Sequence, residues 1–214
     1  MADVAQLKVL NAALAALGNE PLTDLTDDSI QQSGAAYKLL RSIELSFDAV
    51  IGRHGWTCAL EYVQLTPLAA PAGDWKYPWR YTPPGDCLLV WEIEGQLFNG
   101  DAQCWAPRWQ VGTVDTDIGA RQIIRSRDSI DTLNVAYVRR CSYGALTPHL
   151  VDAIGHELAG RCCFSINGDA GTAERLKNTA EKKILMAISV EGTQEGGQQP
   201  IAPSIPQMIR NRSR

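Results

Sequence analysis

The sequence changes character twice, and these two changes constrain the fold more than any other feature. Residues 1–59 and 143–191 carry apolar side chains at the three- and four-residue spacing of amphipathic helices. Residues 60–142 hold most of the aromatic residues, interrupted by turn signals such as Pro83-Pro84-Gly85 and Asn99-Gly100. The chain is therefore predicted to be an α+β protein, with a small antiparallel β-sheet or barrel inserted into a bundle of four helices.

The first two helices are expected within residues 1–59. Asp3 is the predicted cap of a helix over 3–17, with an inner stripe of Val4, Leu7, Leu10, Leu14 and Leu17. Gly18 follows this helix directly and is predicted to end it as a left-handed C-terminal cap. The second helix is predicted to begin near Thr26–Asp28 and to run to His54, an unusual length of roughly 40 Å at 1.5 Å per residue.

Two more helices are expected after the β-rich segment. Thr147-Pro148 is a cap residue followed by proline at the first helical position, and Asn167-Gly168 ends that helix. Asp169 then caps a fourth helix that ends by Gly192. The best predicted strands between the helical parts are Leu88–Ile93, Trp109–Val114, Arg121–Arg125 and Leu133–Val138.

Charge and composition exclude several classes of protein. The net charge of the 214 residues is −4; residues 192–214 carry three bases and one acid, or +2, which leaves −6 on the rest. Because binding to duplex DNA depends on clustered Lys and Arg, an acidic body of this kind disfavours it. Apolar runs stop short of the ~18 residues that a membrane span needs, and Met1-Ala2-Asp3 lacks the basic start of a secretory signal. The six scattered cysteines predict buried free thiols rather than disulfides or a zinc site.

The sequence offers little support for catalysis. Phosphate-binding glycine loops, a nucleophile elbow and the full zincin motif do not occur. His149, Asp152 and His156 share one helical face, which predicts a solvated surface or a subunit contact rather than a metal site. Acidic pairs such as Glu92/Glu94 and Asp115/Asp117 alternate along strands and are predicted to be solvated. We therefore predict a protein that is not an enzyme and that needs no cofactor or metal.

The most informative local feature is a stretch of alternating aromatic residues, Trp75, Tyr77, Trp79 and Tyr81. One interpretation is a platform on which sugar rings or unpaired bases stack. The other is burial against the sheet or the long helix, which contributes hydrophobic area. Because Pro78 interrupts the alternation, we favour burial, and with Trp56 these residues are predicted to form a structural aromatic cluster.

Residues 192–214 have the composition of an extended arm. The segment begins with glycines and glutamines, and prolines stand at 200, 203 and 206. A solvated tail has no need of large apolar side chains, so the arm is predicted to dock on a partner. The residues expected to make that contact are Ile201, Ile205, Met208, Ile209, Arg210, Arg212 and Arg214.

Several motifs, taken in order, resemble the tail tubular protein A family and related head–tail adaptors of tailed bacteriophages. The similarity extends over residues 1–191, and one departure is that the arm lacks the tryptophan expected near such a C-terminus. The matching motifs are Ala16-Leu17-Gly18-x-x-Pro21-Leu22, Asp27-Asp28-Ser29, His54-Gly55-Trp56-x-x-Ala59, Trp75-x-Tyr77 with Tyr81, Pro84 and Asp86-Cys87, Ala136-Tyr137-Val138, Leu158-Ala159-Gly160 and Phe164-Ser165-Ile166.

The resemblance implies a ring of twelve copies beneath the portal, in the neck of a virion assembled in the host cytoplasm. The long helix would line the DNA channel and supply a subunit interface, for which we expect Lys38, Arg41 and Glu44. The β-rich insertion would face the next tail component, a nozzle or stopper, and the arm would reach onto the portal protein. Double-stranded DNA would pass without sequence-specific binding, and no membrane is involved.

Two other functions remain open at this point. The aromatic stretch 75–81 is compatible with a tail-associated carbohydrate-binding module. Glu92 or Asp115 could serve as the acid of a cell-wall hydrolase. The structural adaptor is the leading hypothesis.

Overall fold

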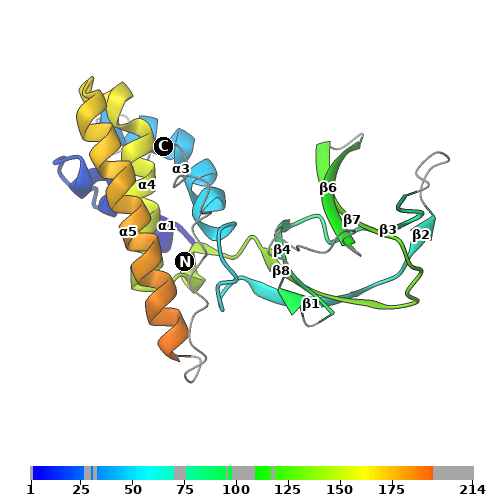
Figure 1. Ribbon diagram of the computed structural model, residues 1–214. Coiled ribbons are helices and arrows are strands. Elements are labelled where there is room, and N and C mark those ends of the chain that lie inside the picture. The colour runs from blue at the N-terminus through cyan, green and yellow to red at the C-terminus, as the bar shows by residue number, and fades with distance from the viewer. Residues whose placement is uncertain are drawn as a thin grey trace, which may run out of the picture.

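The computed structural model shows a helical lobe and a β-sheet lobe, joined by a neck where the chain crosses from one to the other and back (Figure 1). The predicted mixture of helices and small antiparallel sheets is confirmed. No helix within the described ranges combines the length and apolarity that crossing a bilayer requires. The structure describes residues 2–26, 30, 33–69, 76–94, 96–97, 109–116 and 119–194.

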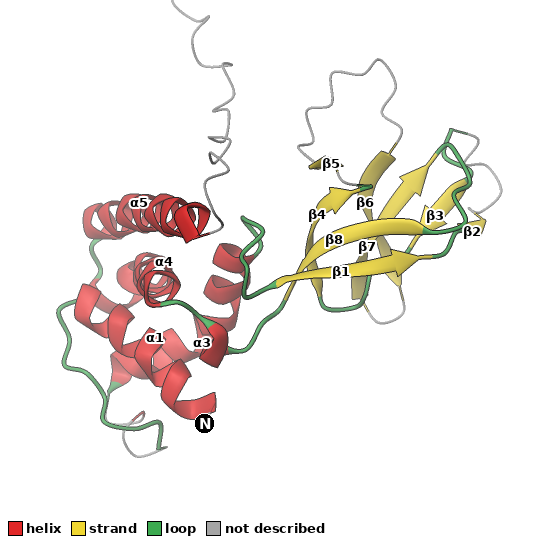
Figure 2. Ribbon diagram, turned by 90° about the horizontal axis from the view of Figure 1, so that it is seen from below, coloured by secondary structure: helices red, strands yellow, loops and turns green. Residues whose placement is uncertain are grey.

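The helical lobe is arranged around a central helix, α4, which contacts the three other helices described (Figure 2). Its glycines allow close approach: a Cβ added to Gly155 would lie 2.6 Å from the Cβ of Ala12, and one added to Gly160 would lie 3.0 Å from the backbone N of Lys177. Small residues at both crossings therefore fix how closely the helices pack. The helices are α1 (Ala2–Ala16), α3 (Gly34–Ile51), α4 (Pro148–Asn167) and α5 (Ala170–Gln194).

Three of the predicted helix ends are confirmed. Gly18 takes a left-handed φ of +75°, and the N–H of Asn19 donates to the carbonyl of Leu14 at 2.9 Å, which closes a Schellman motif after α1. The Thr147 hydroxyl accepts from the N–H of Leu150 at the start of α4, and Gly168, with φ +70°, ends it. These signals act within a few residues, so the sequence carries them locally.

Asp169 caps α5 as predicted, because its carboxylate accepts from the N–H of Gly171 at 2.9 Å. These bonds, and one from the Thr172 side chain above all, hold the pKa of Asp169 below its ordinary value. Helix α5 runs to Gln194, two residues past the expected end at Gly192, so the first residues of the predicted arm belong to a helix.

The predicted long helix over 28–54 is wrong in length. Helix α3 begins at Gly34, because Ser33 is extended (φ −102°, ψ 94°) and its hydroxyl accepts from the N–H of Ala36 at 3.2 Å. It ends at Ile51 and has 18 residues, whereas α5, with 25, is the longest helix described. Residues suited to cap a helix occur at both Thr26–Asp28 and Ser33, and the predicted start was placed at the first of these two positions.

The inner stripe of α1 also differs from the prediction. Val4 is 61% exposed, whereas Val9 and Ala13 are fully buried beside Leu10 and Leu14. The helix begins at Ala2, so Asp3 lies inside it rather than at its cap. The buried face of α1 differs from the predicted one because α4 packs against it. This tertiary contact, rather than the spacing of the larger apolar residues, decides which side chains of α1 are buried.

Two antiparallel sheets form the β lobe, and each has three main strands and one two-residue strand. Their orders are β1-β8-β4-β5 and β2-β3-β7-β6. The four best predicted strands correspond to β4, β6, β7 and β8. The strands are β1 (Leu60–Leu65), β2 (Leu68–Ala69), β3 (Trp79–Tyr81), β4 (Cys87–Ile93), β5 (Gln96–Leu97), β6 (Trp109–Thr116), β7 (Gly119–Ser126) and β8 (Leu133–Arg139).

The alternation of β8 connects two separate cores. Val135 and Tyr137 pack into the core of the β lobe with Tyr81 and Ile124, which come from the other sheet. Val138 points the opposite way and belongs to the core of the helical lobe. The two faces predicted for this strand are therefore confirmed, and the strand anchors one lobe on the other.

The loop after α3 packs against β4 at the neck. The backbone of Gly55 lies against the indole of Trp91, so that a Cβ there would be 2.6 Å from the ring. The His54 ring contacts Trp56 and Trp91 edge to face, with centroids 5.0 and 4.9 Å apart. At the crossing itself, the N–H of Arg139 donates to the carbonyl of Ala59 at 2.8 Å.

Candidate interaction surfaces

Of the three residues expected at a subunit interface, two are engaged within the chain. The Nζ of Lys38 donates to the carbonyl of Ser165 in α4 at 2.5 Å. The Glu44 carboxylate forms an ion pair with Arg140 and accepts from the Tyr143 hydroxyl at 2.8 Å. Desolvation, followed by the bond to Glu44, raises the pKa of Tyr143. Lys38 and Glu44 therefore serve the fold of the helical lobe.

Arg41 lies between Lys38 and Glu44 on the exposed face of α3, beside two exposed apolar side chains. Tyr37 is 52% exposed and Leu45 is 62% exposed, and with Arg41 they are spaced i, i+4 and i+8. We call these three residues the α3 stripe. Sequence reasoning missed Tyr37 and Leu45, although both stand outside the buried positions of the helix and their spacing was a readable signal.

Most of the described residues of the aromatic stretch are buried. Tyr77 is 4% exposed and Tyr81 is fully buried, while Trp79 is half-buried against the core of the β lobe. The Tyr81 hydroxyl donates to the carbonyl of Ile130 and accepts from its N–H, both at 2.9 Å. The two tyrosines thus have no face open to a sugar ring, and burial, the favoured interpretation, is confirmed for them. Trp75 lies outside the described residues.

Trp56 does not join the other aromatics. It is fully buried in the core of the helical lobe, and its Nε1 donates to the carbonyl of Val50 at 3.2 Å. The predicted single aromatic cluster is therefore wrong, because Trp56 and Tyr81 belong to the cores of different lobes.

Four basic side chains lie on or beside the paired strands β3 and β7. Arg80 is directly opposite Arg125 in the strand register. Lys76 and Arg127 both approach the ring of Tyr77, at 5.6 and 5.8 Å from its centroid. Like charges directly opposite each other destabilise a strand pair, so the pairing of Arg80 with Arg125 costs stability that other contacts of the β lobe must offset.

The polar residues of α4 hold helices together. Asp152 accepts from the Nζ of Lys183 in α5 at 2.5 Å and lies 3.1 Å from the Nδ1 of His156. Within the part of the chain that the structure describes, no group of three His, Cys, Asp or Glu side chains is placed to hold a metal ion. Of the trio His149, Asp152 and His156, Asp152 thus contributes an interhelix ion pair with Lys183.

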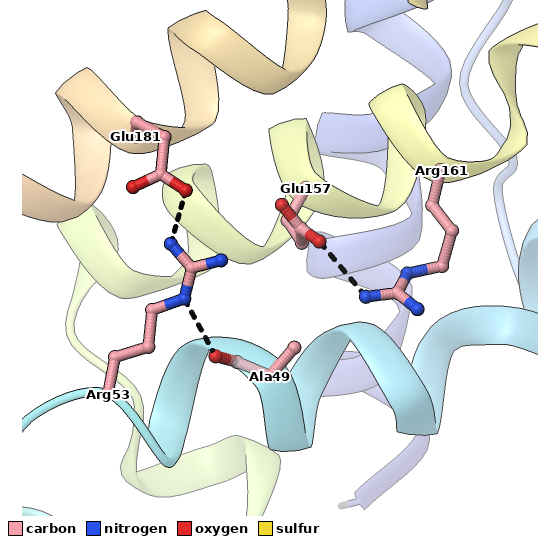
Figure 3. Close-up of polar contacts among 5 residues, drawn as sticks. All are labelled: Ala49, Arg53, Glu157, Arg161 and Glu181. Carbon is pink, nitrogen blue, oxygen red and sulfur yellow. Dashed lines mark hydrogen bonds and ion pairs between the residues drawn. The ribbon is translucent and has the colours of Figure 1, made fainter. Parts of the chain in front are cut away.

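Two more ion pairs stabilise the helical lobe (Figure 3). Arg161 donates to Glu157, one turn earlier on α4, at 3.0 Å, and the Glu157 side chain is 11% exposed. Arg53 pairs with Glu181 of α5 while its Nε donates to the carbonyl of Ala49 at 3.1 Å. The end of α3 is thereby tied to α5.

A shallow depression on the outer face of the β1-β8-β4 sheet is the site nearest to the hydrolase hypothesis. It is lined by Tyr62, Gln64, Asn134 and Glu92, with the edges of neighbouring residues. Among the described residues that line it, Glu92 is the one carboxylate, whereas glycoside hydrolysis ordinarily uses two. The side chain of Asp115 and all seven predicted contact residues of the arm lie outside the described residues.

Comparison with known proteins adds no assignment. A scan against protein-family models finds no match, and a search of curated proteins finds no significant one.

Proposed function

We propose that the protein is a structural head-to-tail adaptor of a tailed bacteriophage. The observation that carries the proposal is a helical lobe whose chain is interrupted by a separate β lobe, in the order that the resemblance to adaptors implies. An adaptor must present different surfaces to its neighbours in the ring, to the portal and to the next tail component. Two lobes with separate cores provide such surfaces within one chain.

In this proposal the four helices form the ring-building core. Twelve copies close into a ring in the virion neck, and the α3 stripe supplies one side of each subunit contact. The β lobe faces the next tail component, and the C-terminal arm docks on the portal. Charge supports passive passage of DNA, because the net charge outside the arm is −6.

The test is to mix the purified protein with portal rings and to image the product by negative-stain electron microscopy. We expect a second ring stacked on the portal, with a co-sedimenting band of constant stoichiometry. Portal rings that remain bare across a wide range of protein concentrations would contradict the proposal.

A truncation examines the arm separately. Deletion of residues 196–214 should leave a folded, soluble protein that no longer attaches to the portal, because a weak arm repeated around a ring binds through multivalency. A matched control keeps the arm's length and replaces Ile201, Ile205, Met208 and Ile209 with serine, and it should fail in the same way. Attachment of either variant at wild-type stoichiometry would move the docking surface onto the helical lobe.

A further inference from the structure

Two cysteines meet where the chain passes between the lobes. Cys58 stands two residues before β1, and Cys141 stands two residues after the end of β8. Their Sγ atoms are 4.0 Å apart, and the neighbouring backbone is held by the bond between Arg139 and Ala59. The two sulfurs are therefore held together on the two chain segments that form the neck.

The other described cysteines face oxygen atoms. The Sγ of Cys87 lies 3.6 Å from Oε1 of Gln122, that of Cys162 lies 3.8 Å from the carbonyl of Lys38, and that of Cys163 lies 3.8 Å from the carbonyl of Asp169. Among these described thiols, the pair at the neck is thus the one arranged for a thiol–thiol reaction.

The two thiols also differ in acidity. A hydrogen bond from Cys58 lowers the pKa of Cys141 against the opposing effect of burial, and the positive charge of Arg139 adds to the lowering. The same hydrogen bond, with burial, raises the pKa of Cys58. Because the thiolate is the nucleophile in disulfide exchange, the more acidic Cys141 is suited to attack a mixed disulfide held on Cys58. Cys58 is the more exposed of the two, so a small disulfide reaches it first.

We propose that Cys58 and Cys141 form a modification site, an intramolecular disulfide made by exchange with a low-molecular-weight disulfide such as oxidised glutathione. The Cys58 thiol loses its proton as its sulfur attacks the glutathione disulfide, which forms a mixed disulfide on Cys58 and releases one glutathione thiolate. The Cys141 thiolate then attacks the Cys58 sulfur and expels the second. Two protein thiols are oxidised, one glutathione disulfide is reduced to two thiols, and the two protons go to the released thiolates.

The geometry needs a small adjustment. A disulfide bond is about 2.05 Å long, so the sulfurs must approach each other by about 2 Å for the bond to form. The bond would close a loop over residues 59–140, which includes the whole β lobe, and would fix the two chain segments of the neck to each other. Long closed loops restrict the unfolded chain strongly, so thermal stability should rise.

The experiment uses the full-length protein in a glutathione redox buffer, with remaining thiols blocked by iodoacetamide before non-reducing peptide mapping by mass spectrometry. We expect the wild type to give a peptide that links Cys58 with Cys141 and a melting temperature higher by roughly 5–15 °C, reversed by dithiothreitol. Cys87→Ser is the matched control and should behave like the wild type. Cys141→Ser should stop at a glutathione adduct on Cys58 and should show no such rise.

Three results would overturn the proposal. Cys58 and Cys141 could both remain alkylated under oxidising buffer, the mixed disulfide on Cys58 could accumulate in the wild type without resolving, or either cysteine could pair with a different one. A linkage that forms only in urea would also contradict it, because the inference concerns the native neck. None of these outcomes bears on the adaptor proposal, which does not depend on the thiols.

Discussion

The backbones of α1 and α4 touch where Gly155 lies against Ala12, since a Cβ on Gly155 would lie 2.6 Å from that of Ala12 and 3.2 Å from its carbonyl carbon. Neither group is the movable end of a long side chain. The contact therefore sets the distance between the two helices, and Gly155 should be intolerant of any larger residue.

We expect Gly155→Ala to lower the free energy of unfolding by ~1–3 kcal/mol, because the overpacking outweighs the gain in helix propensity. The measurement is urea denaturation followed by circular dichroism. Gly34→Ala is the control: it stands in the first turn of α3 with nothing within 4 Å of its added Cβ, and it should change stability little. Equal midpoints for the two variants would show that α1 and α4 are not held at this spacing.

Tyr81 gives a second prediction. Tyr81→Phe removes a hydroxyl that both donates to and accepts from the backbone of Ile130, so both backbone groups lose their partner. The expected loss is ~1–3 kcal/mol by denaturation. Tyr62→Phe is the matched control, because it makes the same change at a tyrosine that is 76% exposed. Its free energy of unfolding should stay within about 0.5 kcal/mol of the wild type.

The same variants examine the carbohydrate hypothesis. If the aromatic residues are structural, oligosaccharides should leave the tryptophan fluorescence of the wild type unchanged. A saturable response that Tyr81→Phe leaves intact would restore a binding role for this part of the β lobe.

The environment of Asp48 leads to a prediction about how the stability of the protein depends on pH. Burial raises the pKa of its carboxyl, an effect that Arg140 opposes and Glu44 reinforces. The folded state therefore binds this proton more tightly than the unfolded chain does, and the contribution of Asp48 to stability falls as pH rises from about 3.9 through the higher folded pKa. Asp48→Asn should thus gain stability relative to the wild type as pH rises above about 3.9, the ordinary pKa of Asp.

Urea midpoints of both proteins across that range provide the measurement. Glu20→Gln, at an exposed carboxylate after α1, is the control, and its urea midpoints should follow those of the wild type across the pH range. A difference between Asp48→Asn and the wild type that stays constant or shrinks toward neutral pH would show that Arg140 dominates the site.

Local signals explain what could be predicted. The caps at Gly18, Thr147, Gly168 and Asp169 each depend on residues within one turn, and the alternation along β8 depends on neighbours two apart, so the sequence displays them directly.

The sequence could not show contacts whose partners are distant in the chain. Val4 is exposed because α4 covers another face of α1. Glu44 is occupied by Arg140 and Tyr143, which lie nearly a hundred residues away. The interface prediction relied on charged residues, and two of these, Lys38 and Glu44, make contacts within the chain. It overlooked Tyr37 and Leu45, the apolar residues of the α3 stripe.

The α3 stripe leads to a revised interface prediction. Arg41→Glu and Leu45→Ser should each reduce ring formation, measured by light scattering and electron microscopy, while the circular dichroism of the monomer stays intact. Both side chains are on the outer face of α3, so the fold does not need them. Lys8→Glu makes the same charge change on α1 and should assemble normally. Normal rings from Arg41→Glu and Leu45→Ser together would exclude α3 from the subunit contact.

The last prediction concerns DNA. Arg139 lies 2.6 Å from the carboxylate of Glu61, and Arg140 pairs with Glu44 and lies 3.0 Å from Asp48, so these cations are offset by acids. In the proposed ring, such pairing would leave little net positive potential in the lumen, so DNA should slide through it without sticking.

We therefore expect no retained duplex in a mobility-shift assay at physiological salt. Binding at micromolar concentration or tighter would contradict passive passage and would direct attention to Arg121, Arg125 and Arg127. In that event Arg125→Glu should weaken the complex and flatten its salt dependence, because it removes one of the two arginines paired directly opposite each other in β3 and β7. Arg139→Glu, at an arginine already paired with Glu61, should have the smaller effect. Equal losses from both variants would show that the bound DNA does not distinguish the β3–β7 strand pair from the neck.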